Sequence, residues 1–172
     1  AIYDDDDKKR TVREAMKRLD LDEKVFDPRA VMGMISQAKD NLILPDVFAE
    51  QAQDYYKSRV AEVYTLYEKL MKNANALDFD DIILKTVLLL QNYEEVRAYY
   101  QRKFRYVLVD EYQDTNHAQY VLCALLAGGY QNICVVGDDD QSIYKFRGAT
   151  ITNILEFEQQ YPGAKTVRLE QN

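Results

Sequence analysis

Apolar residues in the first hundred positions of the chain recur three or four residues apart, the spacing that places side chains on one face of an α-helix. Asp27 before Pro28 is typical of an N-cap followed by a first helical turn. We therefore expect residues 1 to about 103 to be helical. The segments with this pattern are 11–21, a stretch from Pro28, a long stretch from Pro45 to Met71 that residues 73–75 interrupt, and 78–91.

The pattern changes at Tyr106, where short apolar runs begin to alternate with helical spacing. Strand, helix, strand, helix, strand predicts a parallel sheet with crossover helices. Strands in such a sheet are covered on both faces, which explains why they are apolar throughout. The predicted strands are 106–110, 132–137 and 165–169, and the predicted helices between them are 118–127 and 151–161.

Composition limits the class of protein. Hydrophobic residues make up 47% of the 172 positions, enough for a packed core, yet no apolar run is long enough to cross a membrane. Residues 4–10 are all charged, which argues against a signal peptide. The five-residue run DDDDK at 4–8 also matches a protease site used in tags, and we favour native sequence. We interpret Cys123 and Cys134 as buried free thiols of a cytoplasmic protein.

The net charge of −7 argues weakly against a domain that binds nucleic acid through bulk charge alone. Any nucleic-acid site must therefore depend on local residues. A single histidine, His117, excludes a histidine-rich zinc site.

Candidate chemistry lies where the predicted strands end. Asp110 and Glu111 directly follow the apolar run YVLV, and an apolar strand ending in Asp-Glu is the Walker B pattern of nucleotide hydrolases. In that pattern the Asp holds Mg²⁺, and the Glu orients or deprotonates the attacking water. A solvated acidic turn is the alternative. Ligands of open parallel sheets bind beyond the carboxyl ends of the strands. The loop after 106–110 and the loop after 132–137 should therefore meet at one edge of the sheet.

The second loop, GDDDQSIYKFRGA at 137–149, combines acidic, amide, aromatic and basic groups. Tyr144 and Phe146 alternate with Lys145 and Arg147. Aromatic faces can stack on bases and cations can reach phosphates, so this pattern favours a single-strand contact beside a triphosphate site. An ordinary strand can show the same alternation.

Together, DEYQDTN at 110–116, GDDDQSIYKFRGA and the terminal VRLEQN resemble motifs II, III and the start of motif IV of superfamily 1A DNA helicases, the UvrD/PcrA/Rep group. The resemblance implies an α/β fold: a partial RecA-like P-loop NTPase parallel sheet with an inserted all-helical subdomain. By this resemblance, 1–77 is similar to the helical 1B subdomain, 78–163 to the C-terminal half of the 1A ATPase subdomain, and 164–172 to the start of 2A.

The resemblance also implies roles for single residues. Asp110 would bind Mg²⁺, Glu111 would be the catalytic base, and Gln113 with Asp114 would support the loop. Gln141 would contact the γ-phosphate of ATP and take part in catalysis. Tyr144 and Phe146 would stack on the bases of single-stranded DNA, and Arg147 would contact DNA or neighbouring acidic groups. The family most often has Trp at the Phe146 position, so we expect weaker stacking there.

The implied parent protein is an ATP-driven 3′-to-5′ helicase and translocase, with ATP and Mg²⁺ as cofactors. Its partners would be single-stranded DNA, single-strand/duplex junctions and repair proteins, with no membrane. The phosphate-binding pattern G-x-x-x-x-G-K-[ST] does not occur in the chain. We therefore expect an internal fragment that is inactive alone. The alternatives are the helicase part of a RecB/AddA-type helicase-nuclease, and a non-catalytic protein-interaction module.

Overall fold

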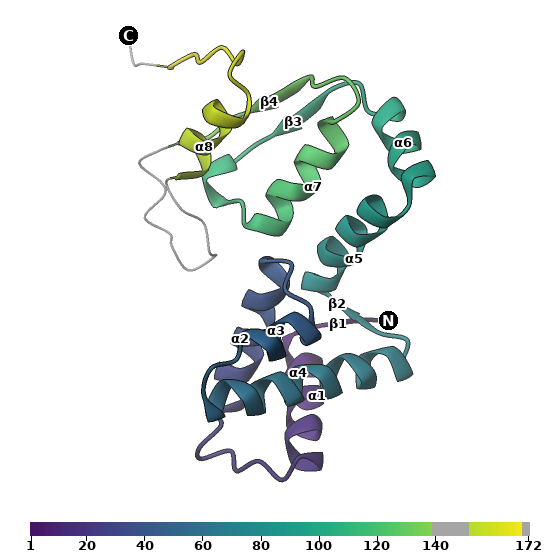
Figure 1. Ribbon diagram of the computed structural model, residues 1–172, viewed down its shortest axis with the longest axis vertical. Coiled ribbons are helices and arrows are strands. Elements are labelled where there is room, and N and C mark those ends of the chain that lie inside the picture. The colour runs from purple at the N-terminus through teal and green to yellow at the C-terminus, as the bar shows by residue number, and fades with distance from the viewer. Residues whose placement is uncertain (139–151, 170–172) are drawn as a thin grey trace.

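The computed structural model describes residues 1–138 and 152–169. Figure 1 shows two lobes: α1 to α4 gather in one, and β3, β4, α7 and α8 in the other. Helix α5 runs between them and packs against both α2 and α7. The elements are β1 (Ile2–Tyr3), α1 (Asp5–Arg18), α2 (Pro28–Asp40), α3 (Pro45–Gln51), α4 (Tyr55–Asn73), β2 (Leu77–Asp78), α5 (Phe79–Asn92), α6 (Glu94–Lys103), β3 (Val107–Val109), the 3₁₀ turn η1 (Tyr112–Asp114), α7 (His117–Ala127), β4 (Ile133–Val135) and α8 (Thr152–Gln160).

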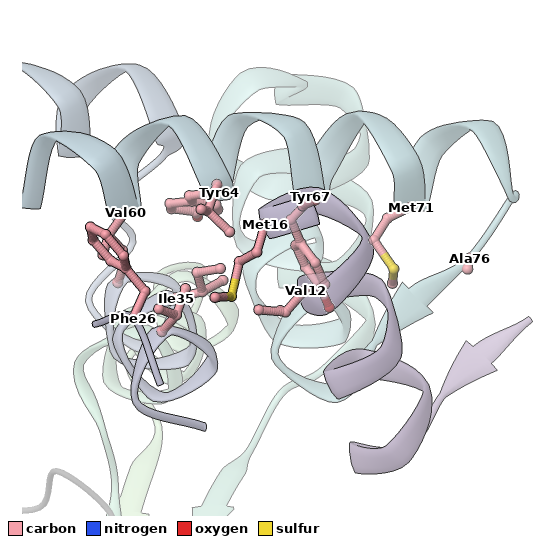
Figure 2. Close-up of a cluster of buried hydrophobic side chains, with 13 residues drawn as sticks. Val12, Met16, Phe26, Ile35, Val60, Tyr64, Tyr67, Met71 and Ala76 are labelled. Carbon is pink, nitrogen blue, oxygen red and sulfur yellow. The ribbon is translucent and has the colours of Figure 1, made fainter. Parts of the chain in front are cut away.

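The helical lobe is built around α4, which packs against α1 and α3, while α1 also packs against α2. The apolar faces that the sequence predicts for these helices are the ones buried. Full burial of a Val, Ile, Phe or Met side chain contributes roughly 1.5–3 kcal/mol to the free energy of folding relative to leaving it exposed. The buried cluster consists of Val12, Ala15, Met16, Phe26, Val31, Ile35, Ala38, Val60, Val63, Tyr64, Tyr67, Met71 and Ala76 (Figure 2).

Two helix boundaries test the predictions at residue level. Helix α2 begins at Pro28, and the Asp27 carboxylate accepts a hydrogen bond from the Arg29 N–H at 3.2 Å, which confirms the predicted N-cap. The long pattern predicted from Pro45 to Met71 is wrong as a single helix. The Asp54 carboxylate accepts the Lys57 N–H at 2.7 Å and starts a new helix there, so α3 and α4 are separate.

A short parallel pairing joins the two ends of the helical lobe. Ile2 lies opposite Leu77 and Tyr3 opposite Asp78, so β1 and β2 run side by side although the whole lobe separates them in sequence. The sequence pattern did not predict either strand, because two-residue strands carry no periodicity.

The other lobe holds the second parallel pair. Val107, Leu108 and Val109 of β3 lie opposite Ile133, Cys134 and Val135 of β4, with α7 as the connection, as predicted. The third strand predicted at 165–169 is wrong: these residues have no regular structure, and Leu169 is 94% exposed. Helices and small parallel sheets together confirm the α/β class.

One face of this sheet is open in the described part of the chain. Leu108 is 76% exposed and Cys134 is exposed, so the expectation that both faces are covered is wrong for these strands. Cys123 is only partly buried; both thiols are free, but neither is fully buried as predicted. Within the described ranges, no helix is long and apolar enough to span a bilayer.

Candidate functional site

The segments that follow β3 and β4 are held together at one edge of the sheet. The Val136 N–H donates to the Val109 carbonyl at 2.8 Å, and the Tyr112 N–H donates to the Val136 carbonyl at 2.9 Å. Because the two strands are parallel, their carboxyl ends meet at this edge, as the sequence predicts.

Asp110 and Glu111 occupy the exposed tip of the first segment. Glu111 has a φ of 50°, in the left-handed region, which costs a non-glycine residue roughly 1–2 kcal/mol. The Asp110 carboxylate accepts the Glu111 N–H at 2.8 Å and helps to hold this turn. Strained backbone of this kind persists where the surrounding structure imposes it, and it is frequent at functional sites.

Gln113 lies beneath the two carboxylates and is 1% exposed. Its side-chain Nε2 donates to Glu111 Oε2 at 2.6 Å. Its Oε1 accepts the backbone N–H of Asp138, the third residue after β4, at 3.0 Å. One buried amide therefore contacts both strand-end segments.

The turn at 110–114 is packed against helix α8 through buried aromatic side chains. Tyr112 is buried against Phe157 of α8, with ring centroids 5.7 Å apart in an edge-to-face arrangement. Burial raises the pKa of the Tyr112 hydroxyl well above its usual range. After the turn, the side chains of Asn116 and Gln119 cap α7 reciprocally, at 2.9 and 3.0 Å. These contacts fix where the chain leaves the acidic tip.

The carboxylates at this tip suit a hard, hydrated cation. Mg²⁺ is commonly held by one or two carboxylates together with water and substrate phosphates. Asp110 and Glu111 offer such oxygen atoms, whereas no group of three or more potential metal-ligating side chains gathers in the described residues. The donor set fits a Mg²⁺ ion that a nucleotide helps to bind.

Five residues singled out in the sequence fall outside the described residues: Gln141, Tyr144, Lys145, Phe146 and Arg147. Of the predicted site, the structure brings together Asp110, Glu111 and the start of the second loop at Asp138.

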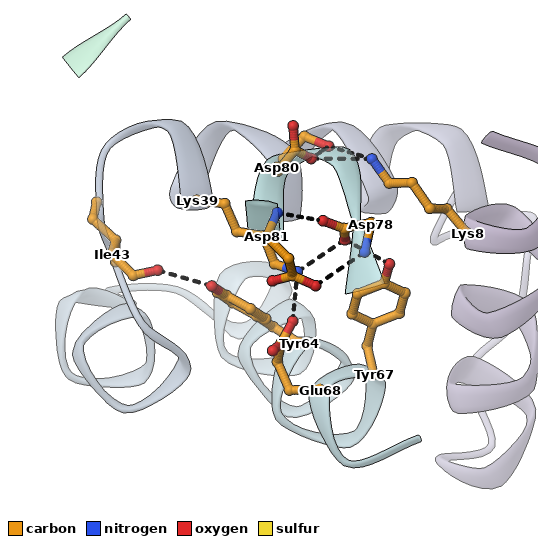
Figure 3. A network of polar contacts seen from close by, with 10 residues as sticks. Lys8, Lys39, Ile43, Tyr64, Tyr67, Glu68, Asp78, Asp80 and Asp81 are labelled. Atoms are coloured by element: carbon orange, nitrogen blue, oxygen red, sulfur yellow. Dashed lines mark hydrogen bonds and ion pairs between the residues drawn. The ribbon is translucent and has the colours of Figure 1, made fainter. Parts of the chain in front are cut away.

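A second polar cluster, which the sequence analysis missed, lies between the helical lobe and α5 (Figure 3). Lys39 is fully buried, and its Nζ lies 2.9 Å from Asp78 Oδ2, 2.9 Å from Asp81 Oδ1 and 2.6 Å from Glu68 Oε1. The Tyr67 hydroxyl donates to Asp78 Oδ2 at 2.8 Å. We call these five residues the Lys39 cluster.

The charges in the Lys39 cluster are mutually dependent. Burial alone lowers the pKa of Lys39, but the carboxylates of Glu68, Asp78 and Asp81 outweigh it and keep the ammonium charged. Burial raises the pKa of Asp78, but Lys39, together with hydrogen bonds from the Asp81 backbone and Tyr67, lowers it below its usual value, so the Asp78 carboxylate is held ionised. The pKa of Glu68 is raised, because burial dominates there.

The signal for part of this cluster was present in the sequence. Asp78 and Asp81 are spaced as a capping box at the start of α5, where the Asp81 N–H donates to Asp78 Oδ1 at 2.8 Å. Beside them, Asp80 Oδ2 accepts hydrogen bonds from Ser36 at 2.8 Å and from Lys8 at 3.1 Å. The Lys39 cluster and the group of Lys8, Ser36 and Asp80 both hold α5 against the helical lobe. Neither resembles a catalytic arrangement.

Comparison with known proteins identifies the family. The family model described as UvrD/REP helicase N-terminal domain matches residues 1–162. The protein named ATP-dependent DNA helicase PcrA from Bacillus subtilis (strain 168) is 50% identical over all of this chain. The proteins of that name from Staphylococcus aureus (strain Mu50) and Staphylococcus epidermidis (strain ATCC 35984) are 49% and 48% identical over 99% of it.

The chain spans about a quarter of the length of these relatives: 23% of the first two and 24% of the third. Since the family model covers nearly all of its residues, the chain belongs to the UvrD/REP helicase family, within the region described as the N-terminal domain.

Proposed function

We propose that this chain is part of an ATP-dependent DNA helicase and that the tip after β3 is one half of its ATPase site. The observation that carries the proposal is the pair Asp110 and Glu111, held at the sheet edge beside the end of β4. The names of the relatives support the reaction. A solvated acidic turn would require neither the left-handed backbone at Glu111 nor the buried amide of Gln113.

In this proposal Asp110 would hold Mg²⁺, and the ion would supply positive charge that offsets the charge of the ATP phosphates. Glu111 orients the attacking water and accepts its proton as the bond between the γ-phosphorus and the bridging oxygen breaks. Both carboxylates are exposed, so water and nucleotide can reach them. Gln141 would contact the γ-phosphate, and Tyr144, Phe146 and Arg147 would contact single-stranded DNA.

We further propose that residues 1–77 form the helical 1B-like subdomain, 78–163 the C-terminal half of a RecA-like 1A subdomain, and 164–172 the start of 2A. The helical lobe and its join to α5 at Phe79 support the first boundary. The open sheet face at Leu108 supports an internal fragment, because the strands of a parallel sheet are normally covered on both faces.

The parent protein would move 3′ to 5′ on single-stranded DNA and open duplexes at single-strand/duplex junctions, in the cytoplasm and in DNA repair or replication. The chain by itself would not hydrolyse ATP, since it contains no Gly-Lys dipeptide for a phosphate-binding loop.

The test uses the full-length protein that contains this chain. We expect DNA-stimulated ATP hydrolysis that Glu111→Gln lowers by roughly 10²–10⁴-fold, because the general base is lost. Binding of a fluorescent ATP analogue should persist. Glu50→Gln, an exposed change on α3, is the matched control and should leave the rate unchanged. A 3′-tailed duplex should be unwound and a 5′-tailed one should not.

A Glu111→Gln rate equal to that of the wild type would contradict the proposed base. For the 172-residue chain alone, a Mg²⁺-dependent ATPase rate that Glu111→Gln abolishes would contradict the proposed inactivity.

A further inference from the structure

The buried amide of Gln113 joins two segments that the sequence separates by more than twenty residues. Its Nε2 lies 2.6 Å from Glu111 Oε2, and its Oε1 lies 3.0 Å from the backbone nitrogen of Asp138. The Gln113 side chain is 1% exposed, whereas Glu111 and Asp138 are exposed.

Only one orientation of this amide satisfies both contacts. The Asp138 backbone N–H is a donor and must meet the amide oxygen. The NH₂ group of Gln113 is then directed to the Glu111 carboxylate, which accepts. The contact to Asp138 therefore decides which group Gln113 presents to Glu111.

Glu111 depends on this contact for its position. Its side chain is exposed, and an exposed glutamate otherwise samples several rotamers. The Gln113 amide donates a hydrogen bond to Oε2 of the Glu111 carboxylate and makes no contact with Oε1. Catalytic geometry is sensitive at this scale, because a displacement of about 1 Å can cost on the order of 10²-fold in rate.

We propose that Gln113 is a positioning residue that orients the Glu111 carboxylate for its reaction and ties it to the backbone of Asp138, the third residue after β4. The inference rests on the proposed function, because it assigns Gln113 a role in that same site. A shift of the Asp138 backbone reaches Glu111 through one side chain.

Two substitutions distinguish the contact of Gln113 with Glu111 from its contact with the Asp138 backbone. Gln113→Leu removes both contacts. Gln113→Glu keeps an oxygen for the Asp138 N–H but replaces the donor to Glu111 with a second carboxylate. If orientation of Glu111 is what matters, both variants should lose activity.

The experiment measures DNA-stimulated ATP hydrolysis by the full-length protein. We expect both Gln113 variants to lower kcat by about 10–100-fold while the KM for ATP stays within about twofold, because Gln113 touches Glu111 and not the nucleotide. Gln101→Leu is the matched control: it removes a part-buried amide of the same kind, which donates to the Leu125 carbonyl at 2.8 Å, and should keep the wild-type kcat. Combined with Glu111→Gln, Gln113→Leu should cause no further loss.

Each other outcome overturns the inference. A wild-type kcat for Gln113→Glu would mean that the contact to Glu111 has no role, and an unchanged kcat for Gln113→Leu would mean that neither contact has one. Should thermal unfolding show that Gln113→Leu does not fold, the Gln113→Glu variant decides alone. If the wild type has no DNA-stimulated ATPase activity, both the proposed function and this inference fail. If the wild type is active and the Gln113 variants keep its kcat, only this inference fails.

Discussion

Lys39 shows how a single buried charge can organise an interface between helices. Its ammonium is surrounded by Glu68, Asp78 and Asp81, so these three carboxylates share one cation. Such a cluster is not in itself evidence of high stability, since desolvation of the charges offsets much of their attraction. Removing the one cation is a different matter, because it leaves carboxylates buried without a counter-charge.

We expect Lys39→Met to lower the free energy of unfolding by about 3–5 kcal/mol at pH 7. Urea denaturation of the chain measures this. Lys69→Met, at an exposed position of the neighbouring helix α4, should change the free energy by less than about 0.5 kcal/mol. A loss below about 1 kcal/mol for Lys39→Met would contradict the view that the carboxylates depend on it.

The sequence did not reveal the role of Lys39, because its partners Asp78 and Asp81 lie about 40 residues away along the chain. Its position beside Ala38, on the buried side of α2, hinted at burial, and the Asp78–Asp81 spacing hinted at a cap. Pairing the two requires knowing that α5 packs on α2, and no local pattern contains that information. Asp110 and Glu111 were found more easily, because the strand that precedes them is adjacent in sequence.

At the scale of elements, α1, α2 and α5 meet around a small polar group that responds to pH. Burial, followed by the nearby carboxylate of Asp80, raises the pKa of Asp40 to about 6, while Lys8 acts in the opposite direction and Asp78 adds a smaller increase. The fold therefore favours the neutral form of Asp40. A raised acid pKa contributes stability below the unfolded value, and that contribution is lost as pH rises through the folded value.

The Asp40→Asn substitution should therefore raise the free energy of unfolding at pH 7.5 by on the order of 1 kcal/mol, after allowance for the partial exposure of Asp40. At pH 4 it should have little effect. Chemical denaturation across pH 4 to 8 measures the difference, and Glu50→Gln on the exposed face of α3 should show no such trend. An equal effect of Asp40→Asn at both ends of the range would refute the assignment.

Element boundaries followed from the sequence where a local signal was strong. Asp27 with Pro28 gave the start of α2, and helical spacing gave α5 and α7. The break between α3 and α4 was missed, because the apolar spacing continues across it while Asp54 caps a new helix. The strand predicted at 165–169 failed for a different reason: β-branched composition alone cannot supply a neighbouring strand.

At the scale of the whole molecule, the described residues leave open the sheet face that carries Leu108 and Cys134. A groove of about 730 Å³ lies between this face and residues 157–164. The opposite side of the same sheet is packed against α7, so the two faces of β3 and β4 have different surroundings.

Thiol labelling measures this difference. Cys134 is exposed, whereas burial raises the pKa of the partly buried Cys123 thiol, so we expect Cys134 to react with a thiol reagent at least roughly 10-fold faster at pH 7.5. The single variants Cys134→Ser and Cys123→Ser assign the two rates. In the full-length protein, the proposed internal position predicts that Cys134 becomes protected. Equal rates in the isolated chain would contradict the open face.

The pairing of β1 with β2 has a consequence for how such a molecule can change over evolutionary time. Because Ile2 lies opposite Leu77, the two ends of the helical lobe are neighbours in space. A segment whose two ends are neighbours can be lengthened, shortened or exchanged for another without moving the scaffold that it interrupts. This parallel ribbon, two residues on each strand, is a place where the helical lobe could diverge while the strand-end carboxylates remain where they are.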